Sequence, residues 1–172
     1  LSRVEEEELD PENEDSARFL RNLQDDATIA IVKIVSAFEE DDLDQSAALD
    51  ELERVHEIVL AEPEFNTGEI PEEKMIIIGD VQTSLICVFH AAEYCILGNT
   101  AEPAPIAEYI EAAADAEADE NVDDALVCLI QAGTRIIAGD KFDVTVLDEI
   151  ECGYYVSEWV NGLDSLQSAM SD

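Results

Sequence analysis

Apolar residues recur at intervals of three and four along most of this chain, which is the spacing of helices that bury one face. The pattern predicts a first long helix over 15–39 and a second that begins after Asp44, a residue suited to capping it. Pro71 is suited to the first turn of an expected third helix. Because this helix is apolar on most sides, we expect 72–97 to form the centre of the fold.

The second half of the chain continues the helical pattern. A fourth helix is expected after Pro103 and Pro105, and a fifth after Asn121, which can accept a hydrogen bond from the first turn. These two should pair as a hairpin. The last stretch, 145–170, reads as one long sixth helix, with an alternative in which the alternating residues 142–146 form a short strand. Because an isolated strand would have nothing to pair with, helix or extended loop is preferred.

The expected fold is therefore all-α. It is a single-domain bundle of about six helices, mostly up-and-down, with one domain over 15–172. An acidic N-terminal segment, 1–14, precedes it, and the end of a truncated helix is one interpretation of that segment.

The net charge of the chain excludes some classes of binding partner. The chain has 172 residues, with 8 Lys and Arg against 43 Asp and Glu, a net charge of −35. Such a chain repels nucleic acids and anionic membrane surfaces, so neither is an expected partner. At 47% hydrophobic residues it nevertheless has the apolar content to fold. The most apolar stretch, 75–97, is interrupted by polar side chains and does not predict a membrane span.

The same net charge also indicates the salt concentration of the solution in which the protein works. In 1 M salt the Debye length is about 3 Å, so neighbouring surface carboxylates hardly repel one another. Acid occurs in every segment, which favours adaptation to a salt-rich cytoplasm with K⁺ or Na⁺ as counter-cations. The alternative is a functional acidic face, as in a DNA mimic or a partner of basic proteins, and this would concentrate acid on one side.

The cysteines indicate an intracellular protein. The four are widely spaced and form no CxxC pair, so they read as reduced thiols packed in the core.

The most specific candidate for a metal or catalytic site is a set of two Glu and two His residues. Glu53 and His56 lie one turn apart on the second helix, and His90 and Glu93 lie one turn apart on the third. If the two helices run antiparallel, the four side chains could converge on a transition metal in a metal-binding or redox bundle. His56 also sits in an apolar stripe, where a histidine is more often a hydrogen-bonded core residue. No other cofactor is expected.

Asp80 is a second residue of interest. It follows Gly79 inside the most apolar helix, where an acid is unusual. It serves either a local hydrogen bond near the end of the helix or a functional role.

The last helix carries an apolar face that suits a protein partner or a second copy of the chain. With aromatic anchors among its members, it is the candidate partner surface. Its residues are Tyr155, Trp159, Val160, Leu163, Leu166 and Met170. The alternative is that this face simply closes the core of the monomer.

Three stretches also carry a family resemblance. They are Leu23-Gln24-Asp25-Asp26, Asp80-Val81-Gln82-Thr83-Ser84-Leu85 and the ending Glu158–Asp172, which reads EWVNGLDSLQSAMSD. With these stretches the chain resembles a family of small acidic archaeal proteins of unknown function, best known from haloarchaea. The resemblance supports the salt-adapted interpretation and implies no activity, cofactor or catalytic residue.

The sequence thus favours a non-enzymatic cytoplasmic helical protein that acts through protein contacts. It would contact either a different protein or a second copy of itself in a dimer. The metal-binding or redox bundle remains the second hypothesis.

Overall fold

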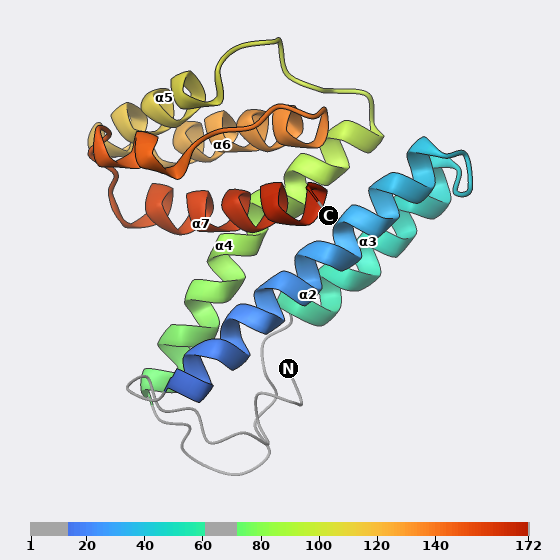
Figure 1. Ribbon diagram of the computed structural model, residues 1–172, viewed down its shortest axis with the longest axis horizontal. Helices are drawn as coiled ribbons and strands as arrows, with labels where there is room; N and C mark the ends of the chain where they lie inside the picture. Colours follow the sequence, from blue (N-terminus) through green and yellow to red (C-terminus); the bar gives the residue numbers. More distant parts are fainter. Residues whose placement is uncertain (1–13, 61–71, 172) are drawn as a thin grey trace.

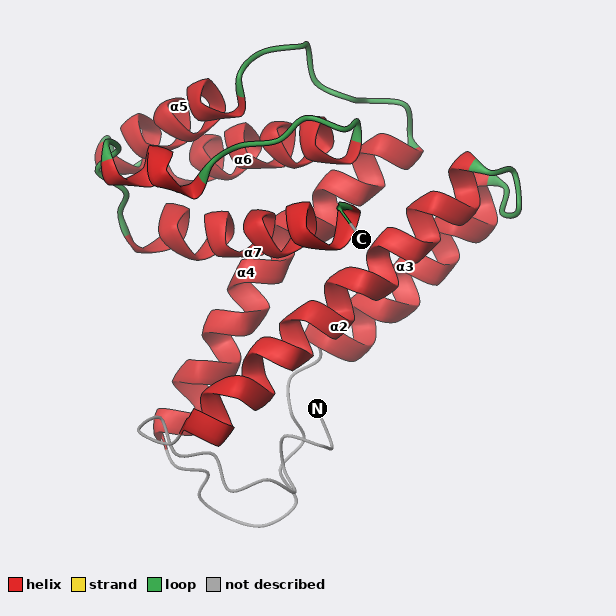
Figure 2. Cartoon of the chain, viewed as in Figure 1, coloured by secondary structure: helices red, strands yellow, loops and turns green. Residues whose placement is uncertain are grey.

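The computed structural model describes residues 14–60 and 72–171 (Figure 1). The described helices are α2 (Glu14–Glu39), α3 (Gln45–Leu60), α4 (Glu72–Ile96), α5 (Ile106–Ala118), α6 (Val122–Ile137) and α7 (Tyr154–Met170), with a short 3-10 helix η1 (Val144–Asp148) before α7. These residues form helices and loops and no strand (Figure 2). The predicted all-α bundle of about six helices is confirmed. The acidic segment predicted over 1–14 lies outside the described residues, apart from Glu14.

Helix α4 lies at the centre of the arrangement, as predicted. Helices α2 and α3 form one hairpin, and α5, α6 and α7 pack together as a second group that lies across it (Figure 1). Helix α4 contacts α2 and α3 on one side and α6 and α7 on the other. A helix that packs on four neighbours must be apolar around most of its circumference, which explains its composition.

Side-chain caps define the first residues of two helices, α3 and α6, at the positions that the sequence predicted. The Asp44 carboxylate accepts a hydrogen bond from the Ala47 amide at 2.8 Å, at the start of α3. The Asn121 side chain accepts one from the Asp124 amide at 3.4 Å, at the start of α6. Each cap satisfies an amide that the first turn of a helix leaves without a partner.

The prediction of one continuous helix over 145–170 is wrong. The chain leaves η1, passes through a short non-helical segment and starts α7 with Gly153, in extended backbone conformation, as the capping residue. The Glu117 carboxylate, at the end of α5, accepts hydrogen bonds from the Tyr155 amide at 2.8 Å and the Val156 amide at 3.4 Å. A side chain at position 153 would meet this carboxylate, because a Cβ there would lie 2.6 Å from its carbon. A cap supplied by another helix therefore fixes the start of α7.

The alternating segment 142–146 is not a strand, in line with the preferred prediction. The amide of the Gln167 side chain pairs with the backbone of Phe142: its oxygen accepts from the Phe142 N–H at 2.7 Å, and its nitrogen donates to the Phe142 carbonyl at 2.9 Å. The first turn of η1 is capped by Asp143, which accepts from the Thr145 amide at 3.0 Å. One glutamine of α7 thus takes the place of a neighbouring strand.

Two glycines allow the central helices to approach one another closely. A Cβ built on Gly162 of α7 would lie 1.9 Å from the carbonyl oxygen of Ser84 in α4, and one built on Gly133 of α6 would lie 2.6 Å from the Cβ of Ala91. Non-bonded atoms do not approach one another this closely. Both crossings therefore require a residue without a side chain. Leu163 and Leu166, which flank the first crossing, are fully buried as a result.

None of the described helices combines the length and the apolar character that a membrane crossing needs.

The Gly162 crossing generates a stability prediction. We expect Gly162→Ala to destabilise the protein by at least about 1–3 kcal/mol, because the added methyl group collides with backbone and the helices must separate. Denaturant unfolding in concentrated KCl measures the change.

Gly79→Ala is the matched control, since Gly79 lies in α4 and a Cβ there would meet nothing within 4 Å. It should be neutral or stabilising by up to about 1 kcal/mol, because alanine is the better helix former. Equal stability of the two variants would show that the crossing tolerates a side chain.

Candidate functional site

Helices α2, α4 and α7 border an open cleft of about 540 Å³. Four carboxylates, several hydroxyl and amide groups and a few apolar side chains line it, and no Lys or Arg is among its described lining residues. The lining consists of Gln24, Asp25, Ile29, Asp80, Val81, Ser84, Glu158, Asn161, Asp164, Ser165, Ser168 and Ala169. The cleft therefore offers many hydrogen-bond acceptors and negative charge beside apolar surface.

Hydrogen bonds between the three helices hold the floor of the cleft. The Ser165 hydroxyl of α7 is 3.0 Å from an Asp25 carboxylate oxygen and 3.1 Å from the Thr28 hydroxyl, both on α2. The Gln24 side chain of α2 donates to the Ser84 hydroxyl of α4 at 3.0 Å. These bonds tie α7 to α2 and α2 to α4 beside the cleft.

One end of the cleft places two carboxylates together. The Tyr154 hydroxyl, at the start of α7, donates a hydrogen bond to Asp80 of α4. That bond is the main reason why the pKa of Tyr154 rises to about 12. Partial burial, and then the negative charge of Asp80, raise the pKa of Glu158 above its ordinary value. Ionised Glu158 is thus partly desolvated and close to a second negative charge.

Aromatic rings stand next to this carboxylate pair. The Tyr154 and Tyr155 rings meet edge to face with centroids 5.3 Å apart, and Tyr155 stacks on Trp159 at 5.6 Å. Tyr154 is 54% exposed and Tyr155 43% exposed, whereas Trp159 is 4% exposed and its indole N–H has no partner within the described structure. Tyr154 is therefore an exposed ring beside Asp80, and Tyr155 is a second exposed ring next to Tyr154.

The predicted partner face of the last helix is mostly core. Trp159, Val160, Leu163 and Leu166 are buried within the chain's own hydrophobic cluster, so these four cannot also contact a partner. This corrects the prediction in favour of its alternative, that the face closes the monomer. The two other members are Met170, which is partly buried against the core, and Tyr155, which stays exposed.

The four residues of the predicted metal cluster do not come together. His90 and Glu93 lie side by side, with Nδ1 and Oε2 3.5 Å apart. The rings of His56 and Phe89 instead meet in a T-shaped contact, with centroids 5.1 Å apart, and Glu53 is exposed. In residues 14–60 and 72–171, no three His, Cys, Asp or Glu side chains are grouped in a way that could hold a metal ion. The described structure therefore does not bring the two helical pairs together as a metal site.

The cysteines are free thiols with different surroundings. Cys87 is fully buried, and burial raises its pKa, so it is an inert core residue as predicted. Cys95, Cys128 and Cys152 are partly buried, and burial raises the pKa of each as well.

The three stretches that carry the family resemblance converge on the cleft. Every residue lining it except Ile29 belongs to 23–26, 80–85 or 158–172. The sequence pattern marks Asp80 as an unusual acid but gives no such signal for Tyr154 and Glu158. They lie more than 70 positions away, and no local pattern indicates that they meet Asp80.

The raised pKa of Glu158 leads to a prediction about how stability depends on pH. Its folded-state pKa is raised, so the cost of ionising it in the folded protein is absent below its ordinary value of 4.5 and present once the pH exceeds the raised value. We expect Glu158→Gln to raise the melting temperature at pH 7 and to have no such effect at pH 4. Thermal unfolding in concentrated KCl at both pH values provides the measurement.

Glu108→Gln on the exposed face of α5 removes the same charge away from the cleft and serves as the control. A lower melting temperature for Glu158→Gln at pH 7 would mean that its carboxylate makes a favourable contact instead.

Comparison with known proteins identifies the family but transfers no activity. No functionally curated protein and no solved structure matches the chain. A family model described as an uncharacterized protein conserved in archaea, DUF2150, matches residues 1–172, and the chain therefore belongs to this archaeal family.

Proposed function

We propose that this protein is a non-enzymatic cytoplasmic protein of a salt-rich cell, which acts by docking another protein in the cleft between α2, α4 and α7. The observation that carries the proposal is the lining of the cleft, where carboxylates without a cationic partner in that lining stand beside apolar side chains, with the exposed Tyr154 bonded to one of the carboxylates at the border of the cleft. Such a surface is suited to a partner that brings both positive charge and apolar groups.

The burial of the last helix strengthens this choice of surface. Trp159, Val160, Leu163 and Leu166 are buried in the core, which leaves only Tyr155 and part of Met170 on that face for self-association. The cleft, by contrast, is open and includes Ile29, which is 41% exposed. A protein partner is favoured over a nucleic acid, because the net charge of −35 repels phosphates.

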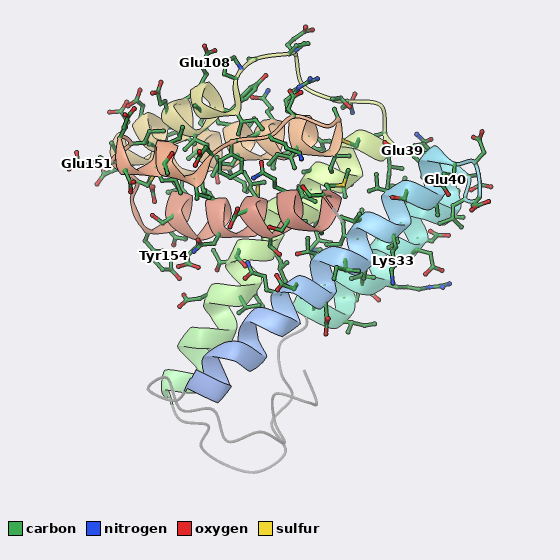
Figure 3. The ribbon with its side chains drawn as sticks, viewed as in Figure 1. Lys33, Glu39, Glu40, Glu108, Glu151 and Tyr154 are labelled. Carbon is green, nitrogen blue, oxygen red and sulfur yellow. The ribbon has the colours of Figure 1, made fainter. Side chains whose placement is uncertain are left out.

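The distribution of charge supports adaptation to concentrated salt. Carboxylates lie at separate ends of the molecule, with Glu39 and Glu40 beside the α2–α3 turn, Glu108 on α5 and Glu151 before α7 (Figure 3). Ion pairs with Lys or Arg in the described part of the chain are few, namely Arg54 with Glu51 and Arg135 with Asp140. Most of the acid therefore depends on dissolved cations for screening.

This charge generates a salt prediction. Helical circular dichroism should be lost below roughly 0.5–1 M KCl, because unscreened carboxylates then repel one another across the whole surface. A titration from about 3 M KCl downwards measures it. Full helicity at about 0.1 M KCl would contradict the salt-adapted interpretation.

A cleft variant tests the docking function. We expect the double substitution Asp80→Asn with Glu158→Gln to reduce severalfold the amount of partner that the full chain captures from archaeal cells in about 3 M KCl. Captured proteins are quantified by mass spectrometry against the unmodified chain.

The control is Glu108→Gln with Glu111→Gln, which removes two charges from the exposed face of α5 and should leave capture unchanged. If both double variants capture the same proteins in the same amounts, the cleft is not the docking site.

A further inference from the structure

We propose that the end of the cleft formed by Asp80, Glu158 and the adjoining tyrosines binds an arginine side chain of the partner protein. This inference rests on the proposed docking function and names the chemical group that the cleft selects. It is carried by the juxtaposition of two carboxylates of the cleft lining with two exposed rings at its border: Tyr154, which bonds to Asp80, and Tyr155, which meets Tyr154 edge to face.

The two carboxylates supply the charge. Asp80 lies on α4 and Glu158 on α7, and both line the cleft. Glu158 is partly buried and faces the charge of Asp80, so a cation placed between them would relieve the repulsion that the free protein carries. Because the site is partly desolvated, concentrated salt weakens its attraction for a cation less than it weakens that of fully exposed surface carboxylates.

The tyrosines select the kind of cation. The hydroxyl of Tyr154 is bonded to Asp80, which keeps its ring beside the carboxylates, and Tyr155 is held in place by stacking on Trp159. A guanidinium is planar: it can donate to a carboxylate in its own plane while its face lies against an aromatic ring. An ammonium is a compact and strongly hydrated charge that gains less from such a site.

The remainder of the cleft suits the residues that flank such an arginine. Ile29 and Val81 offer apolar contact, while Asn161 and Ser168 offer groups that can bond to a peptide backbone. An arginine in an exposed protein segment therefore fits the cleft better than a free inorganic cation, which would use only the charge.

Short peptides test the selection directly. The probes are acetyl-Gly-Ala-Xaa-Ala-Gly-amide with arginine, lysine or citrulline as the central residue, titrated into the full chain in about 3 M KCl. Binding is followed by the fluorescence of Trp159, the chain's single tryptophan, and by calorimetry. We expect the lysine peptide to bind about tenfold more weakly than the arginine peptide, and the uncharged citrulline peptide to show no saturable binding.

Variants locate the binding. Asp80→Asn with Glu158→Gln should abolish the preference for arginine over lysine, and Tyr155→Leu should reduce it, whereas Glu108→Gln with Glu111→Gln should leave it unchanged. Circular dichroism of each variant confirms folding. If the first double variant loses helicity, the single substitutions Asp80→Asn and Glu158→Gln replace it.

Equal affinity for the arginine and lysine peptides, no binding of either, or equal losses in the control variant would each overturn the inference. The result is separable from the docking test. Cleft-dependent capture of a partner without arginine selection would refute the arginine site alone, whereas capture that ignores the cleft variants would refute the docking function.

Discussion

The contact between Gly162 and the backbone of Ser84 determines how the other helices can be placed. Only a residue without a side chain lets α7 lie directly on α4. That approach buries Leu163 and Leu166 in the core and brings the opposite edge of α7 beside α2. The same crossing therefore builds both the core and the cleft, which is the space left on the outer side of the three helices.

Sequence patterns predicted the parts of the fold that depend on near neighbours. The caps at Asp44 and Asn121 act within three residues, and the apolar spacing of α4 reflects its burial on several sides. The break before α7 could not be predicted in this way, since the carboxylate that caps it comes from Glu117, 38 positions from Tyr155. A helical period describes a face but not which distant side chain will terminate it.

The candidate site shows the same division. Spacing correctly placed His90 beside Glu93, because residues three apart share a helix face, but it could not determine whether two helices would bring their pairs together. The apolar stripe around Trp159 is compatible with a partner surface and with a monomer core, because its spacing is the same whether it meets its own core or another protein. Asp80 stood out locally, while its meeting with Tyr154 depends on the α4–α7 crossing.

The pairing of Gln167 with Phe142 has a consequence for how the protein stays dispersed. The segment 142–146 alternates apolar and polar residues, and such a segment with free backbone groups can recruit a strand from a neighbouring molecule. Concentrated salt would strengthen that tendency by promoting burial of apolar surface. Here a side chain of the same molecule occupies both the N–H and the carbonyl of Phe142, so the segment has no open pairing site at this residue from which intermolecular sheet could grow.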